Sequence, residues 1–317
     1  MKNIIIMYAG DDWKKMVPIT NKGTRIAIED WMVRAEKAGV MLYRASMKWY
    51  DCEKNQFEKA WTFKGGSWQK IENRIQADLI YDKVLSKYDY SLLDFKLRIA
   101  QKTILFNSPL FRAIFNSKLS QYVMFGQFMP FSQIANDESE LKIAIDKSPA
   151  EKIVAKPLYG CGGQGIFIGK KSEALTQKYK YPVLVQEFIV SEKGIPGLSK
   201  NDEIADLRLV YQGGKLAYAL SRIAAKGSFF TNLHQGATGK MISPETIPDS
   251  LMMIVKELNQ RISIFPGAQY SLDFIFDNAG RPYFIEMNTT PGIDLVTLLA
   301  DEKVKQANFD FIIDLLK

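Results

Sequence analysis

Three oxygen-bearing side chains in the C-terminal third of the chain have the types and spacing to bind a hard cation. Glu286 and Asn288 end an apolar run, and because residues i and i+2 of a strand share a face, their side chains should project together. Asp273 interrupts the apolar stretch YSLDFIF, where a carboxylate is costly to bury without a donor or a metal. If 270–287 forms a hairpin, the three oxygens suit a Mg²⁺ ion that carries a nucleotide. The alternative for Glu286 and Asn288 is a plain turn at the Thr-Thr-Pro-Gly that follows.

A glycine-rich segment, AKPLYGCGGQGIFIG at 155–169, separates two predicted strands. Such a loop can curl over phosphates and offer backbone N–H groups as donors. It is not a Walker loop, because no Gly-Lys-Ser/Thr opens a helix. Lys156 lies in an apolar strand just before the loop, a position that an anion would explain. A flexible hairpin tip is the alternative. The glycines are Gly160, Gly162, Gly163 and Gly165.

Isolated charged residues mark two further candidate sites, one at Glu187 and one at the pair Arg208 and Arg222. Glu187 interrupts the apolar strand VLVQEFI, where a half-buried carboxylate needs donors. The amino group of adenine is one candidate donor, and a solvent-facing edge strand is the alternative. Arg208 and Arg222 lie at opposite ends of one predicted hairpin, which would bring two guanidinium groups together for a phosphate or a carboxylate. His234 is the only histidine, and we expect it to be structural.

Composition narrows the class of protein. The 317 residues are 47% hydrophobic and 24% charged, which predicts two or three lobes with sizeable cores. No apolar run approaches the roughly 18 residues that span a bilayer, and the N-terminus reads as a strand and not as a secretory signal. Two cysteines form no disulfide framework, so we expect a cytoplasmic protein. The net charge of +7 is scattered without a nucleic-acid-binding signature, which favours small anions over nucleic acid or membrane.

The elements that must position these residues fall into two patterns. Strands alternate with helices over residues 1–110, which predicts an open α/β domain. No GxGxxG follows its first strand, so it is not expected to bind a dinucleotide. Later segments read mostly as hairpins, at 204–225 and 270–287. The tryptophans within 49–68 are expected to pack in a core, with an exposed binding surface as the alternative.

The order of these motifs resembles the ATP-grasp superfamily of carboxylate–amine ligases over roughly residues 105–300. In this resemblance NSKL supplies a first nucleotide lysine, Lys118, and MPFS at 129–132 follows it. QEFI matches the hinge that binds adenine. The stretch DLR…GGK…SR…GSFFTNLHQGA is similar to the glutathione-synthetase and ribosomal-protein-glutamylase branch, and it also resembles the spore-coat-associated members. That branch has Gly-Gly where this chain has Gly236-Ala237, and the added Cβ is expected to narrow the acceptor pocket.

The resemblance implies a mixed α/β fold of the ATP-grasp type. Its expected parts are an N-terminal substrate domain over 1–110, a lid with the glycine-rich loop over 111–187, and a C-terminal part with the metal site over 188–317. The expected activity joins a small-molecule or peptide carboxylate to an amine through an acyl phosphate, with ATP as substrate and release of ADP and phosphate. Two alternatives are a kinase acting on a hydroxyl and a non-catalytic, regulatory or coat-associated ATP-binding protein.

The resemblance also implies roles for individual residues. Arg208 and Arg222 would meet the transferred phosphate, and Asn232 would order the acceptor loop. Two Mg²⁺ ions are expected, with Mn²⁺ as the alternative metal. Assembly into a homo-oligomer is left open. Expected metal ligands are Asp273, Glu286 and Asn288, and expected nucleotide-binding residues are Lys118, Lys156, Gly160, Gly162, Gly163, Gln164, Gly165, Gln186, Glu187, Phe188 and Ile189.

Overall fold

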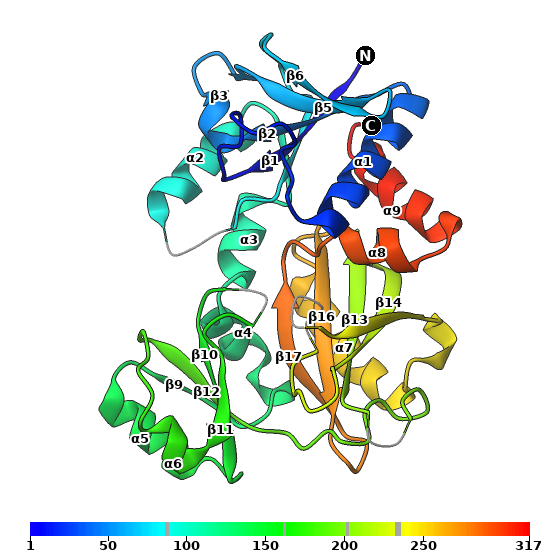
Figure 1. The fold of residues 1–317 in the computed structure, drawn as a ribbon. Helices are drawn as coiled ribbons and strands as arrows, with labels where there is room; N and C mark the ends of the chain where they lie inside the picture. Colours follow the sequence, from blue (N-terminus) through cyan, green and yellow to red (C-terminus); the bar gives the residue numbers. More distant parts are fainter. Residues whose placement is uncertain (86–88, 161–162, 201–202, 232–235) are drawn as a thin grey trace. The chain divides into compact units, whose positions relative to one another are not determined.

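The computed structural model describes residues 1–317 except 86–88, 161–162, 201–202 and 232–235. The described chain forms two compact units (Figure 1). Unit 1 comprises Met1–Ala113 and Thr290–Lys317, and unit 2 comprises Ile114–Thr289. Three residues singled out in the sequence, Gly162, Asn232 and His234, lie outside the described residues.

Unit 1 is built on a six-stranded sheet of order β6-β5-β2-β1-β7-β8. Strand β1 pairs in parallel with both β2 and β7, and β7 pairs in parallel with β8, whereas β5 and β6 form an antiparallel hairpin. The open α/β domain expected at the N-terminus is therefore confirmed. The strands are β1 (Asn3–Tyr8), β2 (Met41–Ser46), β5 (Ala60–Lys64), β6 (Ser67–Ile71), β7 (Leu79–Asp82) and β8 (Ile104–Phe106), beside a small pair of β3 (Tyr50–Asp51) and β4 (Gln56–Phe57).

The alternating side chains of β1 supply two cores, one on each face of this sheet. Ile4 and Ile6 pack with Trp31 on one face, while Ile5 and Met7 pack with Trp61 on the other. Trp49 and Trp61 are buried, as core packing predicts. The helices are α1 (Lys22–Lys37), α2 (Tyr90–Ala100), α8 (Asp294–Leu299) and α9 (Glu302–Asp314), with a 3-10 turn at Met47–Trp49. Helix α3 (Pro109–Phe115) begins in unit 1, and its last two residues belong to unit 2.

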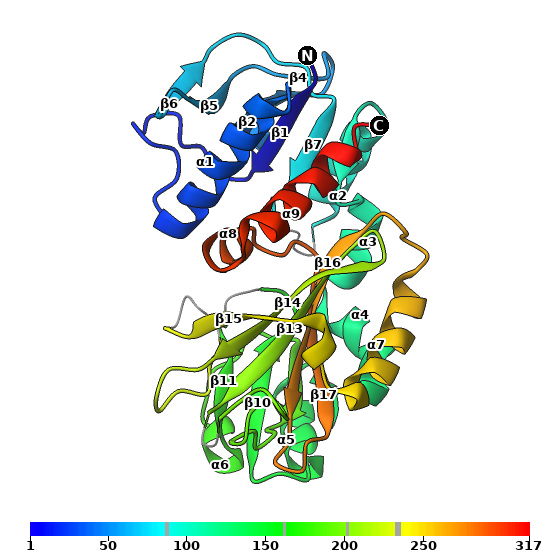
Figure 2. The same cartoon turned by 90° about the vertical axis from the view of Figure 1, so that its right-hand side faces the viewer.

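The last 28 residues belong to unit 1, which differs from the predicted C-terminal part at 188–317. Helix α9 lies on the same face as α1 (Figure 2) and places Phe309 and Ile312 in the core around Trp31. The rings of Trp31 and Phe309 meet edge to face, with centroids 5.9 Å apart. Burying this apolar stripe against α1 is the physical reason for the difference.

Unit 2 contains two antiparallel sheets. One has the order β11-β10-β12-β9 and the other β15-β14-β13-β16-β17. The two predicted hairpins are present, as β13–β14 and β16–β17. Gly213 and Gly214 adopt positive φ in the first turn, which suits a tight hairpin. The strands of the first sheet are β9 (Ser132–Ala135), β10 (Lys152–Pro157), β11 (Phe167–Lys170) and β12 (Val183–Glu187). Those of the second are β13 (Ala205–Gln212), β14 (Lys215–Ile223), β15 (Thr238–Ile242), β16 (Gln269–Phe276) and β17 (Pro282–Asn288).

Helices accompany both sheets of unit 2. Leu141, Ala144 and Ile145 of α5 form a core with strands of the first sheet. Helix α7 carries the amphipathic pattern that the sequence predicts, with Leu251, Val255 and Leu258 buried. The helices are α4 (Lys118–Phe125), α5 (Glu138–Lys147), α6 (Lys171–Ala174) and α7 (Asp249–Ile262), with 3-10 turns at Gly126–Phe128 and Pro244–Thr246. Across the described ranges of the chain, no helix combines the length and hydrophobicity needed to cross a membrane.

Candidate functional site

Arg208 and Arg222 converge on the carboxylate of Asp273 in the second sheet of unit 2. Arg208 donates from Nε to Oδ1 of Asp273 at 2.8 Å and from Nη2 to Oδ2 at 2.6 Å. Arg222 donates from Nη2 to the same Oδ2 at 2.8 Å. The hairpin β13–β14 therefore brings the two guanidinium groups together, as its sequence predicts, although the group they share is a carboxylate of the protein.

Asp206 is a member of this network that sequence reasoning missed. It lies opposite Arg222 in the β13–β14 register, and Arg222 donates from Nε to its Oδ1 at 2.7 Å. Its other oxygen accepts from the hydroxyl of Thr231. The sequence could have predicted it, because Asp206 and Arg208 are two residues apart on one strand and so share a face. Arg222 is thus held between two buried carboxylates, Asp206 and Asp273.

The two carboxyl groups differ in how burial and neighbouring charge combine. Burial disfavours the ionised form of Asp273, but Arg208 and Arg222 outweigh it and hold the pKa below its usual range. Burial also acts on Asp206, where it raises the pKa above the usual range despite the attraction of Arg222. Arg222 itself has a raised pKa because its two carboxylate partners outweigh its burial. The network therefore keeps Arg222 charged and fixed in place.

Two lysines and Glu286 form a neighbouring cluster. Glu286 lies opposite Asp273 in the β16–β17 register. Lys118 Nζ is 3.7 Å from Oε2 of Glu286 and donates to the carbonyl of Gly160 at 3.3 Å. Burial lowers the pKa of Lys156 to about 8; Glu286 opposes this shift and the charge of Lys118 adds to it. Both lysines are buried, so the site concentrates positive charge beside one half-buried carboxylate.

Local contacts hold this cluster in position. Ser117 caps α4 by accepting from Leu119 N, and Lys118 N donates to Leu158 O at 2.9 Å. The buried side chain of Gln121 pairs with the backbone of Met287, accepting from its N–H at 2.8 Å and donating to its carbonyl at 2.9 Å. Gln121 thus fastens α4 to the strand that carries Glu286. Nothing in the sequence marked it, because its partner is 166 residues away.

The glycine-rich loop occupies the predicted position between β10 and β11. Gly160, Gly163 and Gly165 have φ values of 133°, 77° and 71°, which side chains rarely adopt. The neighbouring strands pair in antiparallel register, with Ala155 opposite Phe167. The loop therefore needs glycine at these positions, and it brings the Gly160 carbonyl to Lys118.

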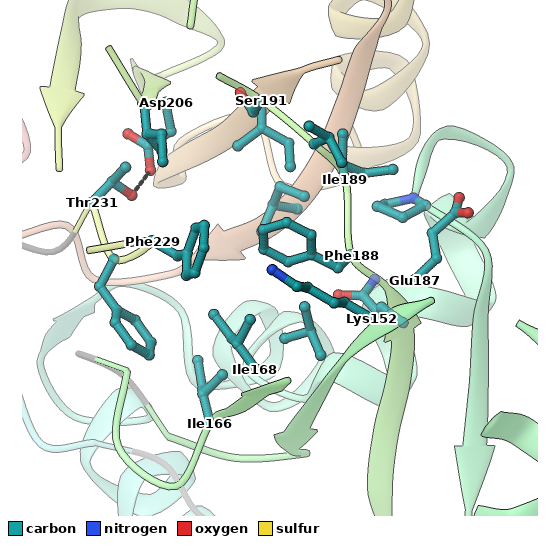
Figure 3. Close-up of a pocket in the computed structure, with 18 of the residues that line it drawn as sticks. Lys152, Ile166, Ile168, Glu187, Phe188, Ile189, Ser191, Asp206, Phe229 and Thr231 are labelled. Atoms are coloured by element: carbon teal, nitrogen blue, oxygen red, sulfur yellow. Dashed lines mark hydrogen bonds between the residues drawn. The ribbon is translucent and has the colours of Figure 1, made fainter. Parts of the chain in front are cut away.

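A cavity of about 390 Å³ lies in unit 2 (Figure 3). Its lining includes Asp206, Arg222 and Asp273 of the arginine network and Lys156 and Glu286 of the lysine cluster. Its lining combines the charged side chains of Lys156, Arg222, Asp273 and Glu286 with a larger apolar portion. Such a pocket suits a ligand that has a flat apolar part and an anionic part. The apolar portion includes Val154, Ile166, Ile168, Ile189, Phe188 and Phe229.

The predicted hinge QEFI lines the cavity, but Glu187 is engaged elsewhere. Its Oε1 accepts from Phe131 N at 2.9 Å, and its own N–H donates to Phe131 O at 2.9 Å. In Figure 3 its carboxylate points away from the Phe188 ring. The donor that the sequence left open is thus a backbone amide of the protein. Gln186 is buried and donates to Ser132 Oγ at 2.8 Å, which leaves Phe188 and Ile189 to line the apolar portion.

Phe229 and Lys152 also line the cavity, and sequence reasoning missed both. The Phe229 ring meets the Phe188 ring edge to face, with centroids 5.1 Å apart. Lys152 Nζ lies 5.2 Å from the Phe229 centroid and 5.7 Å from that of Phe188. Phe229 follows Gly227 and Ser228, so the local sequence is typical of a loop and does not mark this ring as part of a site. It is 44% exposed, and an aromatic ring exposed at a cavity wall is available to a ligand.

Of the three side chains predicted to bind a hard cation, Asp273, Glu286 and Asn288, the structure leaves only some available as ligands. Glu286 and Asn288 share a face of β17, and the nearest charged partner of Glu286 is Lys118 at 3.7 Å. Both oxygens of Asp273 already accept hydrogen bonds from arginine. Among the described residues, no group of three His, Cys, Asp or Glu is arranged to hold a metal. Glu286 is therefore the ligand that the geometry supports best.

Comparisons with known proteins agree on the architecture. The model of the RimK-like ATP-grasp domain matches residues 124–308. D-alanyl-alanine synthetase A from Vibrio cholerae superimposes over 99% of this chain and 98% of its own, with a TM-score of 0.64 and 12% identity. A RiPP-associated ATP-grasp ligase from Chryseobacterium gregarium, solved with ADP and a leader and core peptide, gives 0.61 over 99% and 97%, with 16% identity. These likenesses confirm the predicted fold.

Curated relatives match a smaller portion. A probable alpha-L-glutamate ligase of Shewanella halifaxensis is 28% identical over 173 residues, which are 52% of this chain and 34% of that protein. Probable alpha-L-glutamate ligase 1 of Shewanella denitrificans is 27% identical over 192 residues, 58% of this chain and 59% of that protein. The chain thus spans less than two thirds of the length of either relative.

Proposed function

Because the chain belongs to the RimK-like ATP-grasp family, we propose that it is an ATP-dependent carboxylate–amine ligase that forms an amide bond through an acyl phosphate. The observation that carries the proposal is the grouping of Lys118, Lys156 and Glu286 beside the cavity in unit 2. Two buried cations facing one half-buried carboxylate are poorly balanced unless the site takes up a further anion. The phosphates of ATP supply that anion.

In the proposed binding mode the adenine ring occupies the apolar portion of the cavity. Phe188 and Ile189 of the hinge, with Ile168 opposite, provide a flat apolar slot of suitable composition. Lys118 and Lys156 contact the phosphates, and the loop 159–165 adds backbone donors. Glu286, with Asn288 on the same face of β17, would hold divalent cations, which neutralise triphosphate charge when bound, and Asp273 would join them only by giving up an arginine partner.

The proposed reaction has two steps. An oxygen of the substrate carboxylate bonds to the γ-phosphorus of ATP, and the bond from that phosphorus to the β-phosphate oxygen breaks, releasing ADP. The nitrogen of an amine then bonds to the acyl carbon, phosphate leaves, and the nitrogen gives up a proton. Arg222, fixed between Asp206 and Asp273, is positioned to stabilise the charge on the transferring group.

Two other functions use the same nucleotide site. A kinase would transfer phosphate to a hydroxyl and release no free phosphate. A non-catalytic protein would bind ATP without acceptor-dependent ADP release. The names of the curated relatives make L-glutamate the first amine to try, and the peptide-bound neighbour makes a peptide carboxylate the first acid.

The test measures ADP and phosphate release from Mg-ATP with pairs of amino acids and peptides, with products weighed by mass spectrometry. The expected product has the mass of acid plus amine minus one water, with equal amounts of ADP and phosphate. A product carrying phosphate identifies the kinase. ATP binding with no ADP release for any pair would remove the ligase proposal.

A further inference from the structure

Strand β10 presents a second lysine to the cavity of unit 2, at the apolar portion. Lys152, Val154 and Lys156 are alternate residues of the strand, so their side chains share one face, and all three line the cavity. The intervening Ile153 and Ala155 pack in the core on the other face. A rise of about 3.3 Å per residue places Lys152 about 13 Å along the strand from Lys156. The cavity therefore has one cation at the proposed phosphate position and another well away from it.

The ammonium of Lys152 is held only weakly. Its Nζ lies 5.2 Å from the ring centroid of Phe229 and 5.7 Å from that of Phe188, and Figure 3 shows it beside the Phe188 ring. The exposed carboxylates of Glu151 and Glu192 also line the cavity, but no ion pair among the described residues involves Lys152. An exposed cation–π contact is weaker than a hydrogen bond from a charged donor. An acceptor atom of a ligand would therefore draw this ammonium away from the rings.

The hinge side chains that could read the edge of a base are already engaged within the protein. Glu187 Oε1 accepts from Phe131 N at 2.9 Å, and Gln186 donates to Ser132 Oγ at 2.8 Å. A base that enters the apolar portion of the cavity therefore meets the main chain of the hinge and the ammonium of Lys152. Readout of the base by a charged side chain falls to a residue outside the hinge.

The chemistry of an ammonium narrows the atom that it can contact. An ammonium donates and cannot accept, so Lys152 selects an acceptor atom of the base. Both purines carry such an acceptor at N7, on an edge that the sugar leaves open. In an anti nucleotide the N7 edge faces the side of the 5′-phosphate, whereas N3 lies against the ribose. Because Lys152 and Lys156 project from the same strand face, a nucleotide whose phosphates contact Lys156 turns its N7 edge toward Lys152.

We propose that Lys152 donates a hydrogen bond to N7 of a purine base and so contributes to the selection of a purine nucleotide. This role rests on the nucleotide site of the proposed function. It adds a residue that determines specificity, on the strand that also carries a phosphate-binding lysine.

The test compares ATP with 7-deaza-ATP, in which a C–H group replaces N7. Titration calorimetry on the full-length protein with Mg²⁺ measures both affinities in the absence of acid and amine substrates. The wild type should bind 7-deaza-ATP more weakly than ATP by about tenfold or more, the scale of one hydrogen bond from a charged donor. The two nucleotides share their phosphates, sugar and exocyclic amino group, so the difference reports on N7 alone.

Three variants connect this difference to one side chain. Lys152→Met keeps an apolar stem and removes the ammonium, so it should weaken ATP binding and bind ATP and 7-deaza-ATP equally. Lys152→Arg keeps a charged donor and should still prefer ATP. Lys142→Met removes an exposed lysine of α5 that does not line the cavity, and it should discriminate like the wild type. Because Lys152 is exposed, its variants should melt at the wild-type temperature.

Two outcomes would overturn the role of Lys152 while ATP still binds. They are equal affinity of the wild type for the two nucleotides, and a Lys152→Met protein that still prefers ATP. Failure of the ligase proposal gives a different pattern, because a wild type that discriminates through Lys152 but releases no ADP with any acid and amine would remove only the ligase function. A wild type that binds neither nucleotide would remove the nucleotide site and both proposals with it.

Discussion

Asp273 and Glu286 face each other across the antiparallel pair β16–β17, one saturated by arginine and the other in contact with lysine. The register shifts directly after Asp273, so a β-bulge follows the pair. Two carboxylates at one register position would repel, and the surrounding cations offset that repulsion. This opposition concentrates both charge signs at one cavity wall. Because Glu286 is half-buried whereas Asp273 is buried and bound by two arginines, removing the charge of Glu286 should affect chemistry more than folding.

Glu286→Gln should lower turnover by roughly a hundredfold or more while leaving most ATP affinity and the melting temperature intact. The amide keeps the shape of the half-buried side chain and removes its charge. Asn288→Ala should act in the same direction but less, because water can replace a neutral ligand. The measurement is acceptor-dependent ADP release beside ATP calorimetry. Glu257→Gln, an exposed carboxylate on α7, is the control, and normal turnover of Glu286→Gln would place the cation elsewhere.

ATP affinity should fall as pH rises through about 8, because burial lowers the pKa of Lys156 to that value and only the protonated amine attracts phosphate. ATP should also bind with proton uptake above this pH. Lys156→Arg, which stays charged, should flatten the profile, and Lys156→Ala should weaken binding by about 1–3 kcal/mol. Calorimetry in buffers of different ionisation enthalpy measures both effects.

Lys83 supplies the control for that experiment, since burial also lowers its pKa to about 8 but it lies in unit 1. Lys83→Arg should leave the pH dependence of ATP binding unchanged.

The contribution of Lys156 to folding stability changes with pH in the direction opposite to its effect on ATP affinity. Its folded pKa lies below the ordinary value, so between about pH 8 and about pH 10.5 the unfolded chain binds more protons and the stability contribution rises with pH. An ATP affinity that is flat across this range would contradict the assignment of Lys156.

Asp206→Asn should reduce turnover and stability together, because Arg222 would lose one of the two carboxylates that hold it. Loss of a buried charged hydrogen bond costs on the order of 1–3 kcal/mol. Thermal melting and ADP release measure the two effects, with Asp146→Asn on the exposed face of α5 as control. If Arg222 acts on the transferred phosphate, Arg222→Ala should lower ADP release without abolishing ATP binding. Unchanged turnover in both variants would make the network purely structural.

Gly165→Ala should weaken ATP binding while the protein stays folded. Gly165 has φ +71°, and the added Cβ would lie 3.5 Å from Pro157 Cγ, so strain comes from the backbone and not from a clash. A side chain in this conformation costs about 1–2 kcal/mol. Gly10→Ala, where a Cβ meets nothing within 4 Å and φ is ordinary, is the control. We also expect amide exchange across 159–165 to slow when a non-hydrolysable ATP analogue binds, and protection confined to other segments would make this loop a passive hairpin.

Phe229→Ala should weaken ATP binding by up to about tenfold with little change in melting temperature. The ring contacts Phe188 in the apolar portion of the cavity, and such aromatic pairs contribute about 0.5–1.5 kcal/mol beyond their buried area. Its 44% exposure limits the effect on folding. Met253→Ala, an exposed apolar residue on α7, is the control. Equal ATP affinity in the two variants would exclude Phe229 from the nucleotide site.

The sequence by itself determined the local placement of the candidate site. Alternation in β16 and β17 set which residues share a face, and the glycines of 159–165 mark a loop that ordinary residues could not form. Two-residue periodicity and positive φ are properties of a few neighbouring residues, so they are written in the local sequence. The hairpins of unit 2 and the α/β pattern of unit 1 were predictable for the same reason.

Only the tertiary structure decided which groups meet. The Glu187 carboxylate accepts from the backbone of Phe131, Gln121 pairs with the backbone of Met287, and α9 packs against α1 within unit 1. Each of these depends on pairings between segments distant in sequence. Arg222 joins Asp206 and Asp273 because β13 pairs with β14 on one side and β16 on the other. Local patterns do not specify such a register, since it is fixed by the packing of all the strands at once.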